Sequence, residues 1–198
     1  MNKSLLITGT AGSGKTKLLE MLTADALLAC EHVLFISMEI RKEILFRNIY
    51  SRVKNKQLML NLSVHDRCIS SYRNEDIIDL LRGTNVNTLV IDDIGLMKDQ
   101  LTSDTIARIL TKCNLFASTQ LFRSVTEHGF FQPKNKLVIN FDEYETIEKV
   151  TDGIMSSEAI YVRKKMRNRR NIIDSNNVDC YIINSDRYGL GSHLSIIN

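Results

Sequence analysis

Apolar residues recur along the chain with two spacings, and stretches of the two kinds alternate. Short continuous apolar runs, typical of buried strands, cover 4–8, 33–37, 88–91 and 115–118. Stretches with apolar residues three or four positions apart, typical of amphipathic helices, cover 18–29, 40–53, 77–81 and 105–114. Because each crossover between parallel strands needs a connecting helix, this alternation predicts an α/β fold, with a mainly parallel sheet covered by helices on both faces.

The last third of the chain has a different pattern. Apolar runs that predict strands cover 137–141, 159–162, 179–184 and 193–197. Helical spacing between them is scarce, which indicates an antiparallel extension at the C-terminal edge of the sheet. The length fits one domain over 1–198, and the first strand begins near residue 4, so we expect no separate N-terminal domain.

The segment between the first strand and the first helix fits the phosphate-binding pattern G-x-x-x-x-G-K-[ST]. It consists of Gly9, Thr10, Ala11, Gly12, Ser13, Gly14, Lys15 and Thr16. Glycines let backbone N–H groups turn toward phosphate oxygens, and the N-terminus of the following helix favours negative charge. Lys15 is expected to reach the β- and γ-phosphates and Thr16 to ligate magnesium. The pattern therefore predicts ATP and Mg²⁺ as ligands.

A second carboxylate is expected at the end of a neighbouring apolar strand. Asp92 and Asp93 follow the run at 88–91 directly. We expect Asp92 to hold the magnesium ion, directly or through water. Asp93 either shares that role or begins an exposed loop.

Four segments also resemble the motor domain of DnaB-type replicative helicases, and they occur in the order of that family. They are 33–40 (VLFISMEI), 88–97 (TLVIDDIGLM), 116–125 (FASTQLFRSV) and 184–191 (NSDRYGLG). The chain departs from the family pattern at Phe122, where asparagine is common, and at Ser185, where lysine is usual. The resemblance implies a RecA-like P-loop core that hydrolyses ATP.

The resemblance assigns catalytic roles to three further residues. Glu39 corresponds to the general base that activates the attacking water. Gln120 corresponds to the residue that senses the γ-phosphate, and Arg187 to an arginine finger inserted into the neighbouring subunit's site. Each residue also has a plain structural alternative. Glu39 could be a glutamate at the start of a helix, where the helix dipole favours negative charge. Gln120 could be an ordinary polar residue at a strand end, and Arg187 a surface arginine in a turn.

Two loops are candidates for contact with nucleic acid, because in ring-shaped RecA-like motors they face the central channel. The first, 95–103, contains Lys98. The second, 121–136, contains cations and aromatic residues: Arg123, Phe130, Phe131, Lys134 and Lys136. Cations beside aromatic rings suit single-stranded nucleic acid, through phosphate neutralisation and base stacking. The alternative is that the phenylalanines pack into the core while the lysines are solvated.

Composition changes this interpretation little. The net charge is +3, but six basic residues gather within 163–170 and form either a solvated face or a polyanion-binding stretch. The four cysteines show no paired, metal-like spacing, which favours reduced thiols in the cytoplasm. No signal peptide and no apolar run of about 18 residues is recognisable, so no membrane contact is expected.

These observations predict an ATP-dependent nucleic-acid motor, a DnaB-like helicase core that acts on single-stranded DNA. It would be a homo-oligomer such as a hexameric ring, with a separate replication protein as a further partner. The small size suits a phage- or plasmid-encoded protein that acts in the host cytoplasm. Two alternatives stay open: a RecA-like recombination or packaging ATPase, and an ATP-dependent switch or loader that is not a motor.

Overall fold

The structure is a computed structural model of the 198-residue chain. The residues that it describes are 2–9, 12–37, 40–66, 72–99, 101–120, 141, 143–149, 159–169, 172–173, 179–185 and 193–196. Side chains are described as far as residue 120 and at Phe141, and beyond residue 142 the description is of the backbone alone.

Helices and strands alternate through the first 120 residues. The helices are α1 (Lys15–Leu28), α2 (Lys42–Val53), α3 (Lys56–Met59), α4 (Asn74–Leu81), the short 3₁₀ helix η2 (Ile94–Leu96) and α5 (Ser103–Leu110). The strands in this part are β1 (Ser4–Gly9), β2 (Val33–Ile36), β3 (Leu62–His65), β4 (Thr88–Ile91) and β5 (Asn114–Gln120). The later strands are β6 (Glu143–Lys149), β7 (Ala159–Arg169), β8 (Ile172–Ile173), β9 (Asp179–Ser185) and β10 (His193–Ile196).

The strands form one twisted sheet with a parallel part and an antiparallel part. Within the described residues, the parallel part has the order β3-β2-β4-β5-β1-β6. The order then continues through antiparallel pairs as β6-β7-β9-β10, and β8 pairs with β7. The predicted α/β architecture, a parallel sheet with an antiparallel extension at its C-terminal edge, is confirmed.

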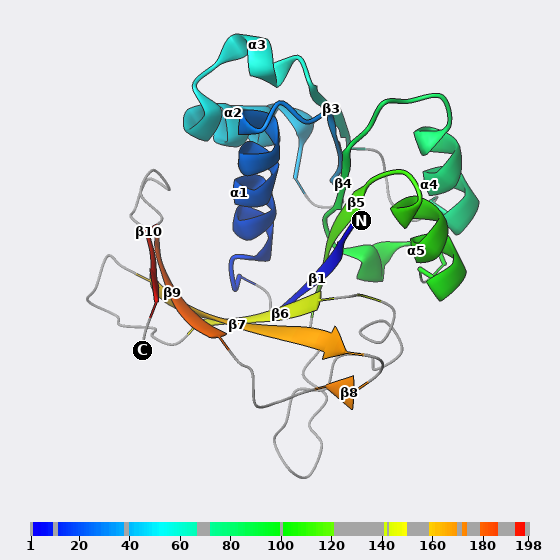
Figure 1. Cartoon of the computed structure of the whole chain (residues 1–198). Coiled ribbons are helices and arrows are strands. Elements are labelled where there is room, and N and C mark those ends of the chain that lie inside the picture. Colours follow the sequence, from blue (N-terminus) through cyan, green and yellow to red (C-terminus); the bar gives the residue numbers. More distant parts are fainter. Residues whose placement is uncertain are drawn as a thin grey trace.

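Helices cover both faces of the parallel part, as Figure 1 shows. Leu5 and Val90 belong to a buried cluster formed with α1, α2 and α3 on one face. Leu6 and Ile91, each one position along the same strands, belong to the cluster formed with α4 and α5 on the other face. Successive side chains in a strand point to opposite faces, so strands buried on both sides are apolar at every position.

Some boundaries and elements differ from the sequence-based expectation. The helix predicted at 105–114 ends at Leu110, and Asn114 already belongs to β5. Strands β3 and β6 were not predicted, because charged or polar residues interrupt their apolar positions. The strand predicted at 137–141 falls outside the described residues except for Phe141, which is buried but not in a strand.

The basic stretch 163–170, expected to be either a solvated face or a polyanion-binding stretch, begins within β7. The antiparallel register with β6 sets Arg167 opposite Glu143 and Lys165 opposite Glu145. Residues directly opposite in an antiparallel pair are cross-strand neighbours, and opposite charges there favour the pairing. The backbone register thus sets two of the six basic residues opposite glutamates.

Two further expectations concern membranes and cysteines. Among the described residues, no helix is long and apolar enough to cross a membrane. Cys30 is exposed and Cys113 is buried, and both are free thiols. Burial raises the pKa of the Cys113 thiol to about 11, which keeps it protonated and unreactive near neutral pH.

The C-terminus of α1 ends in a Schellman motif. Glu31 N donates to Ala26 O at 3.0 Å, and Cys30 N donates to Leu27 O at 2.9 Å. Cys30 occupies the position of this motif that needs a left-handed backbone, with φ of 61°. Glycine is preferred there because a Cβ atom is disfavoured in that conformation.

We predict that Cys30→Gly raises the free energy of unfolding by about 0.5–1 kcal/mol, because it relieves the left-handed strain at some cost in chain entropy. Urea unfolding followed by circular dichroism measures this change. The matched control is Cys30→Ala, which removes the thiol but keeps Cβ and should not stabilise. Equal stability of the two variants would contradict the prediction.

Candidate functional site

The glycine-rich loop joins the end of β1 to the start of α1. Gly12 and Gly14 both have left-handed backbones, with φ of 73° and 92°. These are conformations that residues with a Cβ atom rarely adopt, so the glycines are needed for this path of the chain. Thr10 and Ala11 lie outside the described residues.

The N-terminus of α1 has features that favour an anion. The helix is 14 residues long, and its first turn holds no acidic residue. Among the described residues, no side chain caps it, since the N-cap position is Gly14. Unpaired N–H groups and the helix dipole together attract negative charge to such an end.

Ser13, within the same loop, has a buried hydroxyl that lacks a partner. Its exposure is 1 %, and Oγ makes no hydrogen bond to any residue that the structure describes. Leaving a buried polar group unpaired costs about 1–3 kcal/mol, so such a group is a candidate for contact with a bound ligand.

Two side chains from the first turn of α1 make defined contacts. Lys15 Nζ donates to Gly9 O at 3.2 Å, so this side chain folds back over the loop to the end of β1. Thr16 Oγ1 donates to Asp92 Oδ2 at 2.9 Å, although the two residues are 76 positions apart in sequence. The structure thus brings together the two residues that the sequence predicts to share a magnesium ion.

Asp92 lies directly after β4 and is held from both neighbouring strands. Its backbone N donates to Ile36 O of β2 at 2.9 Å. Ser118 Oγ of β5 donates to Asp92 Oδ1 at 2.7 Å. The residue is only 2 % exposed, so the carboxylate is positioned within the protein rather than by solvent.

Asp93 has a different role from its neighbour. Its backbone is left-handed, with φ of 58°, and its Oδ1 accepts a hydrogen bond from Gly95 N at 3.1 Å. The side chain therefore caps η2. Asp93 itself is 5 % exposed, whereas Gly95, Leu96 and Lys98 in the turn that follows it are exposed.

Gln120 lies at the end of β5, which separates β1 from β4 in the sheet. The parallel register pairs Gln120 with Gly9, the first residue of the glycine-rich loop. Because the ends of parallel strands meet at one edge, Gln120 lies between the loop and Asp92 along that edge.

Of the other predicted site residues, the structure describes only Lys98. Glu39, Arg123, Lys134, Lys136 and Arg187 lie outside the described residues. The segment that contains Glu39 is bounded by a reciprocal contact: Ser37 Oγ donates to Ile40 O at 2.6 Å and accepts from Ile40 N at 3.0 Å. Lys98 is exposed in the turn after η2, and its backbone N donates to Tyr72 O at 3.2 Å.

Two oxygen groups could hold a metal ion at this site, those of Thr16 and Asp92. Among the described residues, no group of three or more His, Cys, Asp or Glu side chains could hold a metal ion. Magnesium often takes one or two protein oxygens and leaves its other positions to phosphate oxygens and water. Thr16 Oγ1 and Asp92 Oδ2, 2.9 Å apart, fit this kind of binding.

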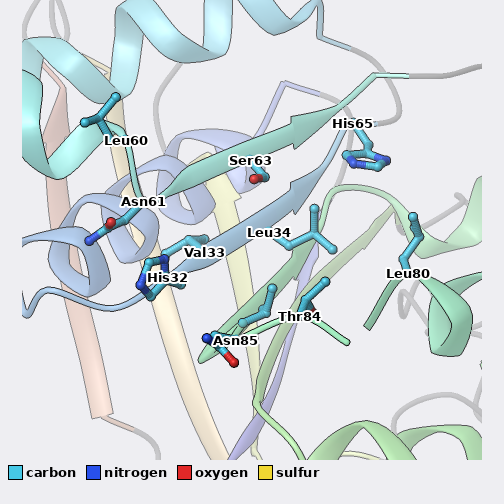
Figure 2. A pocket seen from close by; sticks show the side chains of 11 residues that line it. His32, Val33, Leu34, Leu60, Asn61, Ser63, His65, Leu80, Thr84 and Asn85 are labelled. Carbon is cyan, nitrogen blue, oxygen red and sulfur yellow. The ribbon is translucent and has the colours of Figure 1, made fainter. Parts of the chain in front are cut away.

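A cavity of about 220 Å³ lies elsewhere on the molecule, along β2 and β3 and beside the turn after α4. Figure 2 shows His32, Leu34 and His65 among its lining residues, with Leu80 from α4. It is smaller than common ligand pockets of about 300–1,000 Å³. The described residues that line it include none of those predicted to bind nucleotide or nucleic acid.

Two residues at the site were not singled out by sequence reasoning. Ser13 entered the prediction only as one position of the loop, and Ser118 only as one position of the strand and of the segment 116–125, with no role assigned to it. A signal for Ser118 existed, because it precedes Gln120 by two positions and therefore shares a face of the strand with it.

No family model matches the chain, and no curated protein matches it either.

The turn after β4 packs closely against β5. A Cβ atom at Gly95 would lie 2.9 Å from Thr119 Oγ1 and 3.0 Å from Asp93 Oδ1. We predict that Gly95→Ala lowers the free energy of unfolding by about 1–3 kcal/mol, because it overpacks this contact. Thr119→Ala removes the nearer obstacle, so the double variant should lose less than the sum of the two single changes. Strict additivity in urea unfolding would contradict the predicted contact.

Proposed function

We propose that the chain is an ATP-dependent nucleic-acid motor of the RecA-like type, most similar in plan to a DnaB-like helicase core. It would hydrolyse ATP at subunit interfaces of an oligomeric ring and translocate on single-stranded DNA. The observation that carries the nucleotide part is the 2.9 Å contact between Thr16 Oγ1 and Asp92 Oδ2. This contact joins the glycine-rich loop to the carboxylate strand, as a magnesium–nucleotide site requires.

The phosphate groups of ATP would lie at the N-terminus of α1. Support comes from the left-handed glycines and from the helix end without a side-chain cap. The buried hydroxyl of Ser13, which has no hydrogen-bond partner among the described residues, adds to it. A phosphate oxygen is an acceptor that the Ser13 hydroxyl and the backbone N–H groups could both use. Lys15, which now contacts Gly9 O, is long enough to exchange that carbonyl for a phosphate oxygen.

Magnesium would be held by Thr16 and Asp92. When bound, such an ion neutralises phosphate charge and stabilises the charge that develops during phosphoryl transfer. Thr16 presents its hydroxyl from the first turn of α1, and Asp92 presents Oδ2 from the end of β4. Both groups come from elements of the sheet-and-helix core, so Thr16 and Asp92 need little rearrangement to bind a magnesium ion.

The order of strands supports the assignment of a sensor and a base. Gln120 ends the strand that lies between the loop strand and the carboxylate strand, where the presence of a γ-phosphate could act on it. Glu39 follows β2, the strand on the other side of β4. Activation of water by Glu39 and the role of Arg187 in a neighbouring subunit rest on the resemblance to DnaB-type helicases.

A non-motor function, an ATP-dependent switch or loader, has one observation in its favour. The backbone register of β6 with β7 sets Glu143 opposite Arg167 and Glu145 opposite Lys165, where opposite charges would favour strand pairing without a polyanion. A switch of this kind would hydrolyse ATP slowly and without stimulation by DNA. A recombination or packaging motor shares the same core and would be stimulated by DNA, as a helicase would.

The proposal is tested by steady-state ATP hydrolysis with and without single-stranded DNA. We expect DNA to stimulate hydrolysis, and Lys15→Ala to lower the rate about 100-fold, because one charge-stabilising group is lost. Lys56→Ala, which removes an exposed lysine on α3, is the matched control and should leave the rate unchanged. Hydrolysis that is slow and indifferent to DNA would favour the switch, and the absence of nucleotide binding would reject the whole proposal.

A second prediction concerns Gln120. Gln120→Ala should keep ATP binding close to that of the unchanged protein, while the stimulation of hydrolysis by single-stranded DNA is lost. The reason is that Gln120 would transmit the state of the γ-phosphate to the loop that follows β5. Binding of a fluorescent ATP analogue and DNA-stimulated hydrolysis are measured side by side. Unchanged stimulation would exclude the sensor role.

A further inference from the structure

The hydroxyl of Ser118, on β5, is fully buried beside the two aspartates that follow β4. It makes two hydrogen bonds, one with Asp93 N at 2.8 Å and one with Asp92 Oδ1 at 2.7 Å. Its exposure is 0 %. A single hydroxyl of β5 thus contacts two consecutive residues that follow β4.

The direction of both hydrogen bonds can be deduced from their chemistry. A backbone N–H can only donate, so the Ser118 oxygen must accept from Asp93 N. The one hydroxyl proton is then available for Asp92 Oδ1, which accepts it. The main chain of Asp93 therefore orients the Ser118 hydroxyl, and the hydroxyl in turn orients the carboxylate.

The two oxygens of Asp92 have different partners. Oδ1 accepts from Ser118 on β5, and Oδ2 accepts from Thr16 on α1. A hydrogen bond on one oxygen limits rotation of the carboxylate and leaves the other oxygen directed toward α1. Groups that orient a metal ligand in this way commonly affect metal affinity by about 10- to 100-fold.

We propose that Ser118 is a positioning residue for the magnesium site: it holds Asp92 Oδ1 so that Oδ2 is presented to the ion beside Thr16. This inference rests on the proposed function. The inference goes beyond the proposed function, because Ser118 belongs neither to the glycine-rich loop nor to the catalytic residues that the resemblance assigns. Ser118 itself does not touch the nucleotide or the ion.

A buried serine that merely supports the fold would behave differently. Its loss would weaken nucleotide binding with and without magnesium, or would lower stability alone. A positioning residue affects the dependence on magnesium selectively, because metal-free nucleotide binding relies on the loop and the start of α1. The separation of these two affinities is therefore the informative readout.

The experiment measures binding of a fluorescent ATP analogue, first in excess EDTA and then over a series of buffered Mg²⁺ concentrations. Ser118→Ala should raise the Mg²⁺ concentration for half-maximal effect by about 10-fold or more, since a hydrogen bond to a charged group is lost. Its affinity in EDTA should stay within about twofold of the unchanged protein. Ser118→Cys keeps the size but has a weaker donor, so it should give an intermediate increase.

The matched control is Thr23→Val on α1. Thr23 is also fully buried, and its hydroxyl has no hydrogen-bond partner among the residues that the structure describes. This variant removes a buried hydroxyl without touching Asp92, so its magnesium dependence should be unchanged. Circular dichroism establishes which variants fold, and if Ser118→Ala does not fold, Ser118→Cys decides.

Two results would overturn the inference while leaving the proposed function intact. One is an unchanged magnesium dependence in the folded Ser118 variants, and the other is an equal loss of affinity with and without magnesium. If the unchanged protein binds no nucleotide under either condition, the proposed function fails and the role of Ser118 fails with it.

Discussion

The hydrogen bond from Thr16 to Asp92 links the first turn of α1 to the end of β4. It can form only because β1 and β4 are parallel members of one sheet, with their ends at the same edge. The glycines of the loop and the position of β5 follow from the same constraint. The loop must turn tightly from β1 onto one face of the sheet, and β5 must end between the two strands.

Alternation along a strand explains why two neighbouring aspartates have different roles. Val90 belongs to the cluster with α1, so Asp92, two positions later, continues on that face and meets Thr16. Ile91 belongs to the cluster with α4 and α5, and Asp93 follows on that side, where it caps η2. The sequence predicted Asp92 for the magnesium ion but left two roles open for Asp93, because the capping contact of Asp93 with Gly95 N depends on the left-handed turn after β4.

Sequence reasoning was most successful where a single local pattern decides the structure. The runs that became β1, β2 and β4 have an apolar centre and are buried at every position, because both faces of the sheet are covered. It failed at β6, whose sequence Glu-Tyr-Glu-Thr-Ile-Glu-Lys is half charged and is paired with a basic strand. The spacing of Ser118 from Gln120 indicates which face of β5 it occupies, but not its partners, because Asp92 and Asp93 are about 25 positions away in sequence.

The antiparallel extension joins the parallel sheet through β6, and β6 pairs directly with β1 from Leu5 to Gly9. Strand β1 therefore connects the C-terminal strands to the glycine-rich loop, which begins at its last residue, Gly9. A pull applied along β7 or β9 would load the hydrogen bonds between β6 and β1 in shear, where all of them resist together. A shift of β6 along its axis would act directly on the backbone of Gly9, because Ile147 of β6 is the register partner of Gly9.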